Sequence, residues 1–253
     1  MWVHNLNPVI LNLGLIQIRW YGLMYIIGVL FTYWFINWYT KKKKIKITKE
    51  QISDLIFWLV VGLLVGGRLG YVIFYNPALL LKPLEAIAFW KGGMSFHGGF
   101  SLAVLFGYFY CRKHKLKFLR IADIVVIPLP IALMFGRIGN FINGELWGKP
   151  WKFGWAFPLA PDRGTIARYP SQLFEALKNF LIFGSLFWIS SFKKRKDGEL
   201  FFLFLLLYGL FRFLVEFIRE PELILLGITM GQWLSIPMIF IGGIILIKRW
   251  TKS

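Results

Sequence analysis

Long apolar segments dominate the sequence, and a chain with several of them has few ways to hide its surface from water. Seven such segments cover residues 15–39, 52–75, 95–111, 121–136, 170–192, 199–219 and 230–247. About 20 apolar residues suffice for a helix to cross the hydrocarbon core of a bilayer. The sequence therefore predicts an all-α integral membrane protein with seven transmembrane helices, of which the third and fourth are short.

The fourth segment contains two prolines, Pro128 and Pro130. Proline lacks a backbone N–H and clashes with the preceding helical turn, so it kinks or breaks a helix. Inside a membrane, neighbouring groups must then satisfy the freed carbonyls. We therefore expect a bend in this segment and close contact with other helices.

The charge balance follows the same segmentation. Lys and Arg number 30 against 12 Asp and Glu, a formal net charge of +18 that in a soluble protein would suggest a nucleic-acid partner. Most of the basic residues lie in alternate connections, at residues 41–49, 112–120, 193–196 and 248–252. The positive-inside rule then predicts an extracytoplasmic N-terminus and a cytoplasmic C-terminus. The charge is thus a topology signal and an attraction to anionic lipid, and we expect no nucleic-acid partner.

We expect a single polytopic membrane domain over residues 1–253. The longest outer connection, residues 138–169, is rich in Gly, Pro and Trp and has no clean helical or strand period. It is predicted to form a small irregular extracytoplasmic head between spans four and five, with short strands near residues 152–157.

Ionisable residues inside the apolar segments are few. Each costs about 2.5–3.5 kcal/mol at the centre of a membrane helix, so such residues usually face the bundle interior and serve a function. They are Arg68, His97, Arg137, Glu175, Arg212, Glu216 and Arg219. With the predicted orientation, all of them fall in the outer half of the membrane. This convergence of separate segments predicts one polar site there.

The sixth segment carries three of these residues at helical spacing. Arg212, Glu216 and Arg219 stand at i, i+4 and i+7, so they are predicted to share one helical face. A rise of ~1.5 Å per residue would place Arg212 ~10 Å deeper than Arg219. Two interpretations stay open, a salt-bridged face that joins helices and a cationic cleft for phosphate, which the guanidinium fork suits.

His97 lies beside Gly98 and Gly99, which permit close approach of backbone or substrate. An imidazole with a pKa near 6.5 could act as a general base at neutral pH, although a structural role is equally compatible with a lone histidine. The sequence contains no metal-binding or nucleotide-binding motif, so we expect neither a metal nor another cofactor.

The segment at residues 136–148 reads GRIGNFINGELWG and is dense in glycine and polar groups. It could simply be an ordered turn that ends the fourth span. It could also form a polar pocket in which Arg137 binds an anion, Asn140 and Asn143 supply amides, and Glu145 acts as a partner or base.

These motifs resemble a known family. GRIGNFINGELWG closely matches the signature of the prolipoprotein diacylglyceryl transferases, and MSFHGG at residues 94–99 matches that family's histidine motif. Further similarity covers residues 20–25, 66–71, 169–175 and 211–221, in order along nearly the whole chain. Members of this family have seven spans.

The resemblance implies a multi-pass enzyme of the bacterial cell (inner) membrane. Such an enzyme transfers the diacylglyceryl group of phosphatidylglycerol to the lipobox cysteine in a prolipoprotein signal peptide. A thioether forms and glycerol phosphate is released, in the first step of lipoprotein maturation. Family positions with catalytic roles match His97, Arg137, Arg212, Glu145 and Tyr21, and further functional positions match Asn140, Gly148, Glu216 and Arg219. We add Arg68 and Asn143 to the expected binding site because of their outer-half placement.

The residues leave some alternatives open. His97, Glu145 or Glu216 could remove the thiol proton. A transporter or flippase for an anionic lipid would also use outer-half arginines, but the ionisable residues do not continue to the cytoplasmic side and no inverted repeat is visible. A binding scaffold without turnover is a further alternative. A retinal photoreceptor is disfavoured because residues 230–247 contain no lysine.

Overall fold

The computed structural model describes residues 2–13, 17–88, 92–192, 195–221 and 223–251. Residues used above that lie outside this description are Leu15, at the start of the first predicted span, and the basic residues Lys193, Lys194 and Lys252. The chain forms two compact units. Unit 1 combines Met1–Phe35 with Asp123–Ser253, and unit 2 is Ile36–Ala122.

Unit 2 is built on two helices that approach each other through glycines. A Cβ added to Gly70 would lie 2.7 Å from the Cα of Gly98, so only glycine permits this contact. The helix that carries Gly98 begins at Ser95, whose Oγ accepts a hydrogen bond from the Gly98 amide at 3.3 Å. The elements of this unit are α2 (Lys49–Phe74), η1 (Pro77–Leu81), α3 (Pro83–Ala86) and α4 (Phe96–Lys113). His97 is therefore fixed in the first turn of α4, beside α2.

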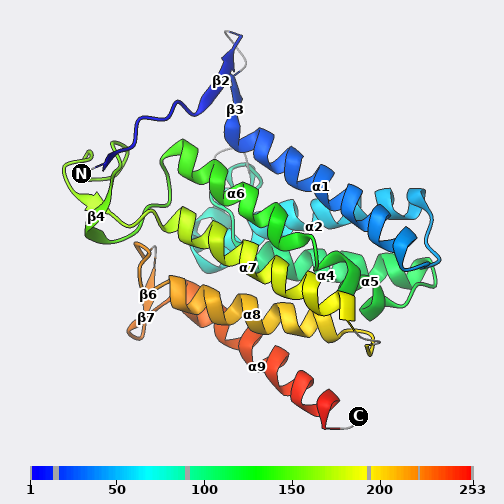
Figure 1. The fold of residues 1–253 in the computed structure, drawn as a ribbon. Coiled ribbons are helices and arrows are strands. Elements are labelled where there is room, and N and C mark those ends of the chain that lie inside the picture. Colours follow the sequence, from blue (N-terminus) through cyan, green and yellow to red (C-terminus); the bar gives the residue numbers. More distant parts are fainter. Residues whose placement is uncertain (1, 14–16, 89–91, 193–194, 222, 252–253) are drawn as a thin grey trace. The chain divides into compact units, whose positions relative to one another are not determined.

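Unit 1 contains a row of packed helices. Helix α7 contacts α6 on one side and α8 on the other, and α8 packs against α9 (Figure 1). Their bounds are α6 (Leu129–Asn143), α7 (Ser171–Phe192), α8 (Glu199–Val215) and α9 (Met230–Trp250). Helix α1 (Trp20–Lys42) and helix α5 (Phe118–Val125) each have residues in both units. This row brings polar residues from separate segments of the sequence into one interior.

A proline bend separates α5 from α6, and Asp123, a residue of α5, caps the start of α8. Helices α5 and α6 are bent by 41° at the break between them, which confirms the bend predicted at Pro128 and Pro130. The carboxylate of Asp123 accepts hydrogen bonds from the amides of Gly198 and Phe201, at 2.6 and 2.8 Å. Because the first amides of a helix have no partner within it, this carboxylate caps α8.

Short strands form the remaining structure of unit 1. Strands β1 (Trp2–Val3), β4 (Pro150–Ala156) and β5 (Ala167–Arg168) make one sheet, with β1 parallel and β5 antiparallel to β4. Two antiparallel pairs join β2 (Val9–Asn12) to β3 (Gln17–Arg19) and β6 (Ile224–Leu225) to β7 (Ile228–Thr229).

The segment predicted as an irregular head is more ordered than expected. Helix α6 continues to Asn143, and β4 covers most of the residues 152–157 that were expected as strand. A small apolar core of Phe141, Phe157 and Ala160, with Trp147 and Trp155 packed against it, holds this segment together. Sheet pairing with β1, from the far N-terminus, supplies the order that local periodicity did not indicate.

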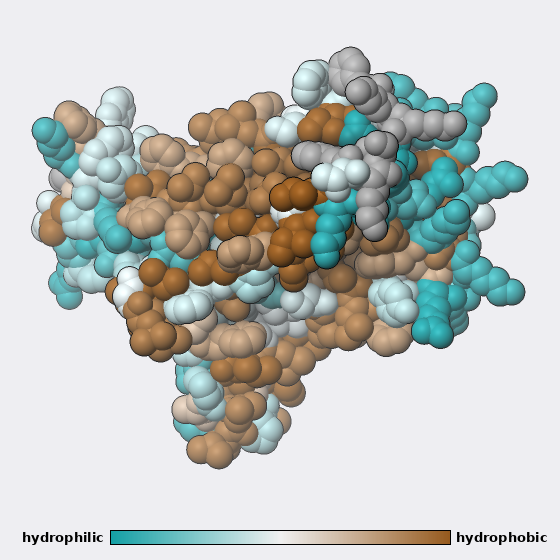
Figure 2. All heavy atoms as spheres, turned by 90° about the horizontal axis from the view of Figure 1, so that it is seen from below, coloured by the Kyte–Doolittle hydropathy of each residue, from teal (hydrophilic) through white to brown (hydrophobic). Residues whose placement is uncertain are grey.

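The helices expose broad apolar surfaces. Among the described residues, α1, α2, α7 and α9 are each long and apolar enough to cross a membrane, and the bent pair α5 and α6 would add a fifth span. Figure 2 shows hydrophobic atoms over much of the helical surface. The fold is thus mostly helical with the character of a membrane protein. Helices α4 and α8 lie outside that group, so a total of seven spans stays a prediction.

Candidate active site: a buried charged cluster in unit 1

Glu175 lies at the centre of a charged cluster inside unit 1. Its side chain is 1% exposed, on the first turns of α7. The Nε of Arg137 lies 2.9 Å from Oε2 of Glu175, and the Nη1 of Arg212 lies 2.7 Å from Oε1. Arg219 also donates to Oε1. Guanidinium groups from α6, from α8 and from the segment after α8 therefore converge on one carboxylate.

Glu216 is the second carboxylate of the cluster. It pairs with Arg212, and its Oε1 lies 3.5 Å from the Nε of Arg219. The hydroxyl of Thr229 donates to Oε2 at 2.8 Å, just before α9 begins. A Cβ added to Gly231 would lie 2.5 Å from Oε1, so the glycine leaves the space that Glu216 occupies.

Lys178 is a fourth cation, which the sequence analysis did not single out. Its Nζ lies 3.7 Å from Oε2 of Glu175 and 4.2 Å from the ring centroid of Tyr208. Its spacing of three residues from Glu175 within an apolar helix was the available signal. With Arg137, Arg212 and Arg219, the four cations face two carboxylates, which leaves a formal net charge of +2.

Arg137 joins this cluster to the polar segment that follows α6. Its Nη1 donates to Oδ1 of Asn140 at 3.4 Å. Asn140 and Asn143 both donate to Oε1 of Glu145, at 2.8 and 3.3 Å. The side-chain amide of Gln172, on α7, donates a hydrogen bond to the backbone carbonyl of Glu145 at 2.5 Å. The residues predicted from the GRIGNFINGELWG segment thus form one hydrogen-bonded network with the cluster.

The members of the cluster differ in how much of each side chain is exposed at the surface. The side chain of Arg137 is 19% exposed and that of Arg212 is 12% exposed. Arg219 is 8% exposed, Lys178 3% and Glu175 1%. An anion that enters the cluster therefore meets two guanidinium forks, with the other charges behind them.

Tyr21 lies beside this network. Its hydroxyl is 2.9 Å from that of Tyr25 on the same helix. A Cβ added to Gly139 would lie 3.1 Å from the Cα of Tyr21, so α1 passes close to α6 at this level. Tyr21 is within electrostatic range of Glu145 and Arg137. The structure brings this predicted residue to the cluster.

Gly148 connects the head to the segment that carries Arg219. The two residues form an antiparallel bridge, and the Gly148 amide donates to the carbonyl of Tyr169 at 2.8 Å. A Cβ at residue 148 would lie 2.7 Å from the Cβ of Tyr169, so glycine is required here. The geometry gives Gly148 a role in holding backbone segments together.

Arg168 makes a second connection in the same place. Its Nε lies 2.6 Å from Oδ2 of Asp162, and its Nη1 donates to Oε2 of Glu220 at 2.9 Å. Burial acts to raise the pKa of the Asp162 carboxyl, but hydrogen bonds from Arg168 and the Gly164 amide bring that pKa below its ordinary value. The carboxylate is therefore held in its charged form.

One expectation about the sixth span is wrong. Helix α8 ends at Val215, and Arg219 lies beyond it in the bridge with Gly148. Arg212 and Glu216 do pair as i and i+4, but Arg219 does not continue their helical face. The guanidinium groups of both arginines nevertheless reach the same carboxylate, Glu175, and the expected ~10 Å difference in depth between the two positions stays a prediction.

Arg68 and His97 belong to unit 2. The guanidinium of Arg68 donates to the carbonyls of Glu85, Ala86 and Gly92, at 2.6, 2.7 and 2.5 Å. These bonds hold the connection between α2 and α4, which favours a structural role, and the predicted role in substrate binding stays a prediction. The His97 ring is partly buried and packs edge-on to Phe96, with 5.4 Å between centroids.

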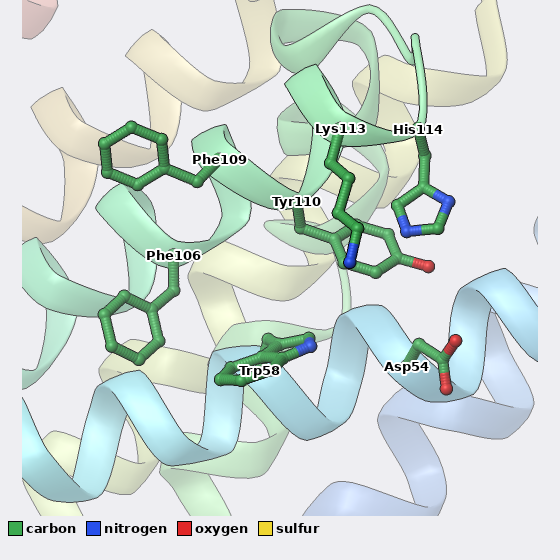
Figure 3. Close-up of a pocket in the computed structure, with 7 residues that line it drawn as sticks. All are labelled: Asp54, Trp58, Phe106, Phe109, Tyr110, Lys113 and His114. Atoms are coloured by element: carbon green, nitrogen blue, oxygen red, sulfur yellow. The ribbon is translucent and has the colours of Figure 1, made fainter.

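Unit 2 also contains a pocket of about 440 Å³ between α2 and α4 (Figure 3). Its lining residues are Asp54, Trp58, Phe106, Phe109, Tyr110, Lys113 and His114. The pocket lies at the end of α4 opposite to His97, and none of the predicted site residues lines it. Within the described ranges, no group of three or more His, Cys, Asp or Glu side chains could hold a metal ion.

The fold is thus that of a mostly helical, membrane-type protein in which buried guanidinium groups converge on two carboxylates. Comparison with known proteins gives a more specific answer. Residues 8–248 match the family model described as prolipoprotein diacylglyceryl transferase. The chain belongs to this family and is a transferase.

Several similar proteins are named phosphatidylglycerol–prolipoprotein diacylglyceryl transferase. One from Bordetella avium (strain 197N) is 45% identical over 247 residues, which cover 95% of this chain and 93% of the relative. One from Vibrio cholerae serotype O1 (strain M66-2) is 46% identical over 253 residues, with 98% and 92% covered. One from Francisella tularensis subsp. novicida (strain U112) is 43% identical over 259 residues, with 98% and 95% covered.

Proposed function

We propose that the charged cluster of unit 1 binds the phosphate of phosphatidylglycerol while this chain performs its family's transfer. The diacylglyceryl group passes to the thiol of the lipobox cysteine of a prolipoprotein, and glycerol phosphate leaves. The observation that carries the proposal is the surplus of buried positive charge, with Arg137 and Arg212 as its most exposed members. The names of the similar proteins supply the two substrates.

The arrangement suits the charge changes of this reaction. A phosphodiester carries one negative charge, and a second develops on the phosphate when the bond from the glyceryl carbon to oxygen breaks. The planar fork of a guanidinium group can hold two phosphate oxygens at once. Both Nη atoms of Arg212 already contact Glu175 and Glu216, so a bound phosphate would share this arginine with those carboxylates. Donors that are fixed in position before the reaction stabilise such developing charge without further reorganisation.

The acceptor thiol must lose a proton before it can attack carbon, since its ordinary pKa is about 8.5. We propose His97 as the base, on its chemistry and on its place in the family's histidine motif. Both oxygens of Glu216 are already engaged by arginines or Thr229, which makes this carboxylate a weaker candidate. Glu145 accepts two amide hydrogen bonds and stays the alternative.

The other expected residues have supporting roles in this proposal. Tyr21, Asn140 and Asn143 could hydrogen-bond the glycerol hydroxyls of the lipid head group. Arg219 stabilises Glu175 and Glu216 from behind.

We also propose the finer membrane arrangement, a single domain with seven spans and an extracytoplasmic head. Helices α4 and α8 would complete the set as short spans. Helices α1, α4 and α9 end in basic turns, at Lys41 and Lys42, Arg112 and Lys113, and Lys248 and Arg249. The positive-inside rule favours the cytoplasm for these ends and an extracytoplasmic N-terminus.

Transfer can be tested with purified protein, a lipobox peptide and one pure lipid at a time. We expect mass spectrometry to detect the thioether product with phosphatidylglycerol and little or none with phosphatidylethanolamine. The ammonium of the second lipid would meet the same arginines, and that lipid lacks the glycerol hydroxyls. Equal rates with both lipids would contradict the proposed head-group site, and no product with either would contradict the function.

The base can be tested by substitution. We expect His97→Gln to lower kcat by about 10²–10⁴-fold, the usual contribution of a general base. His114→Gln is the matched control, because His114 stacks on Tyr110 at the other end of α4 and should be dispensable. Steady-state rates with phosphatidylglycerol and the peptide measure both. A His97→Gln rate within a few-fold of the unsubstituted protein would assign the base to Glu145 or Glu216.

A further inference from the structure

Lys178 is a buried lysine whose burial is energetically unfavourable, and the proposed binding of phosphate by Arg137 and Arg212 does not require it. Its side chain is 3% exposed, and no described group accepts a hydrogen bond from its Nζ. An ammonium has three N–H donors, and its burial without acceptors is unfavourable. Its contacts are Glu175 at 3.7 Å and the face of Tyr208. Glu175 already has three guanidinium partners, so Lys178 adds to the positive charge that surrounds this carboxylate.

We propose that Lys178 is a positioning residue that supplies the second unit of positive charge required as the phosphate leaves. This inference rests on the proposed function. The ammonium offsets Glu175 from behind, so that Arg137 and Arg212 keep more of their charge for the ligand. With Lys178 the cluster has a formal net charge of +2, and without it the net charge would be +1.

The phosphate gains its second negative charge only when the bond to the glyceryl carbon breaks. We therefore expect Lys178 to affect the rate of transfer more than the binding of the lipid. The base takes the thiol proton, the sulfur forms a bond to the glyceryl carbon, and the bond from that carbon to oxygen breaks. Its electron pair stays on the phosphate, which changes from a singly charged diester to a doubly charged monoester. A net charge of +1 on the cluster would balance the single negative charge of the bound lipid. A net charge of +2 balances the two negative charges of the glycerol phosphate that leaves. Interactions that strengthen in the transition state raise kcat.

Lys178 acts through Glu175 in this proposal and does not touch the ligand. Arg137 and Arg212 are the exposed members of the cluster, and Lys178 lies behind them. A residue of this kind should be dispensable for stability, because Glu175 keeps its three arginine partners without Lys178 and no buried charge is left unpaired. Activity and stability are therefore expected to change independently.

The test compares K178M, K178R and the matched control K152M, which removes an exposed lysine from β4 in the same unit. For K178M we expect kcat to fall about tenfold or more while KM for phosphatidylglycerol changes by less than about threefold, the pattern of a transition-state effect. Inhibition by glycerol phosphate should weaken by a similar factor. The melting temperature should be unchanged or higher. K178R should keep most of the activity, and K152M all of it.

Each other result overturns the inference. An unchanged kcat in K178M would make Lys178 irrelevant to the reaction, and a higher KM with normal kcat would assign it to lipid binding. A K178M protein that does not fold would assign the ammonium to stability.

A measurement of ligand binding tests the role of Lys178 without relying on transferase activity. Thermal stabilisation by glycerol phosphate, compared with singly charged dimethyl phosphate, should weaken in K178M for the doubly charged ligand alone. If the unsubstituted protein makes no thioether, the proposed function fails, but this binding difference still decides whether Lys178 selects a doubly charged phosphate. Equal binding of glycerol phosphate by K178M and the unsubstituted protein would reject that selection.

Discussion

Replacing Arg137 with alanine is expected to lower transferase activity by about 10²–10³-fold, the usual effect of removing one donor that stabilises developing charge. Arg137 is the most exposed guanidinium of the cluster, and it contacts both Glu175 and Asn140. Its loss removes one of the two guanidinium groups proposed to bind phosphate, together with the contact between the charged cluster and the Glu145 network. Rates of thioether formation, measured by mass with phosphatidylglycerol and a lipobox peptide, give kcat and KM.

Two further variants make the Arg137 result specific. Arg137→Lys keeps the charge but cannot hold two oxygens in one plane, so we expect little rescue. Arg19→Ala is the control, because Arg19 is an exposed arginine of β3 in the same unit whose side chain donates to the neighbouring Gln17. Full activity in Arg137→Lys would contradict binding by the guanidinium fork.

Substitution of Glu175 by glutamine should have the largest effect on stability. The change keeps the shape of the side chain but leaves Arg137, Arg212, Arg219 and Lys178 with a single carboxylate. Breaking a buried ion pair by removal of one partner costs about 3–5 kcal/mol. We expect a markedly lower melting temperature in detergent and little activity.

Glu220→Gln is the matched control for this change. Glu220 also pairs with an arginine, Arg168, but its side chain is 50% exposed. Exposed ion pairs contribute about 0–1 kcal/mol, so the melting temperature should hardly change. Adding K178M to Glu175→Gln removes one of the uncompensated cations and should recover part of the stability. A melting temperature of Glu175→Gln equal to that of the control would show that the cluster is not electrostatically balanced by Glu175.

The sequence was informative wherever a residue interrupts a hydrophobic pattern. Arg137, Arg212 and Glu216 were recognisable because charges are rare in apolar spans, and the structure brings them together. The central position of Glu175 was not predictable in the same way. It depends on how α7 is rotated against α6 and α8, and a single helix does not encode that rotation.

Long-range pairing accounts for the other differences. The i, i+4, i+7 pattern predicts a continuous helix through Arg219, but a backbone bridge to Gly148 replaces the last turn. Asp123 caps a helix whose first residues are far along the chain, at Gly198 and Phe201. Spacing within one segment contains no information about such partners.

The bridge between Gly148 and Arg219 has a mechanical consequence. The Lys149 amide donates to the carbonyl of Ile218 at 2.9 Å. The Arg168 guanidinium donates both to the Gly148 carbonyl and to the Glu220 carboxylate. The strands of the head and the chain after α8 are therefore tied together by backbone and side-chain hydrogen bonds on both sides of Arg219, and we expect them to move together. A displacement of the strands is expected to reach the carboxylate of Glu175, because Arg219 belongs to the bridge and contacts that carboxylate.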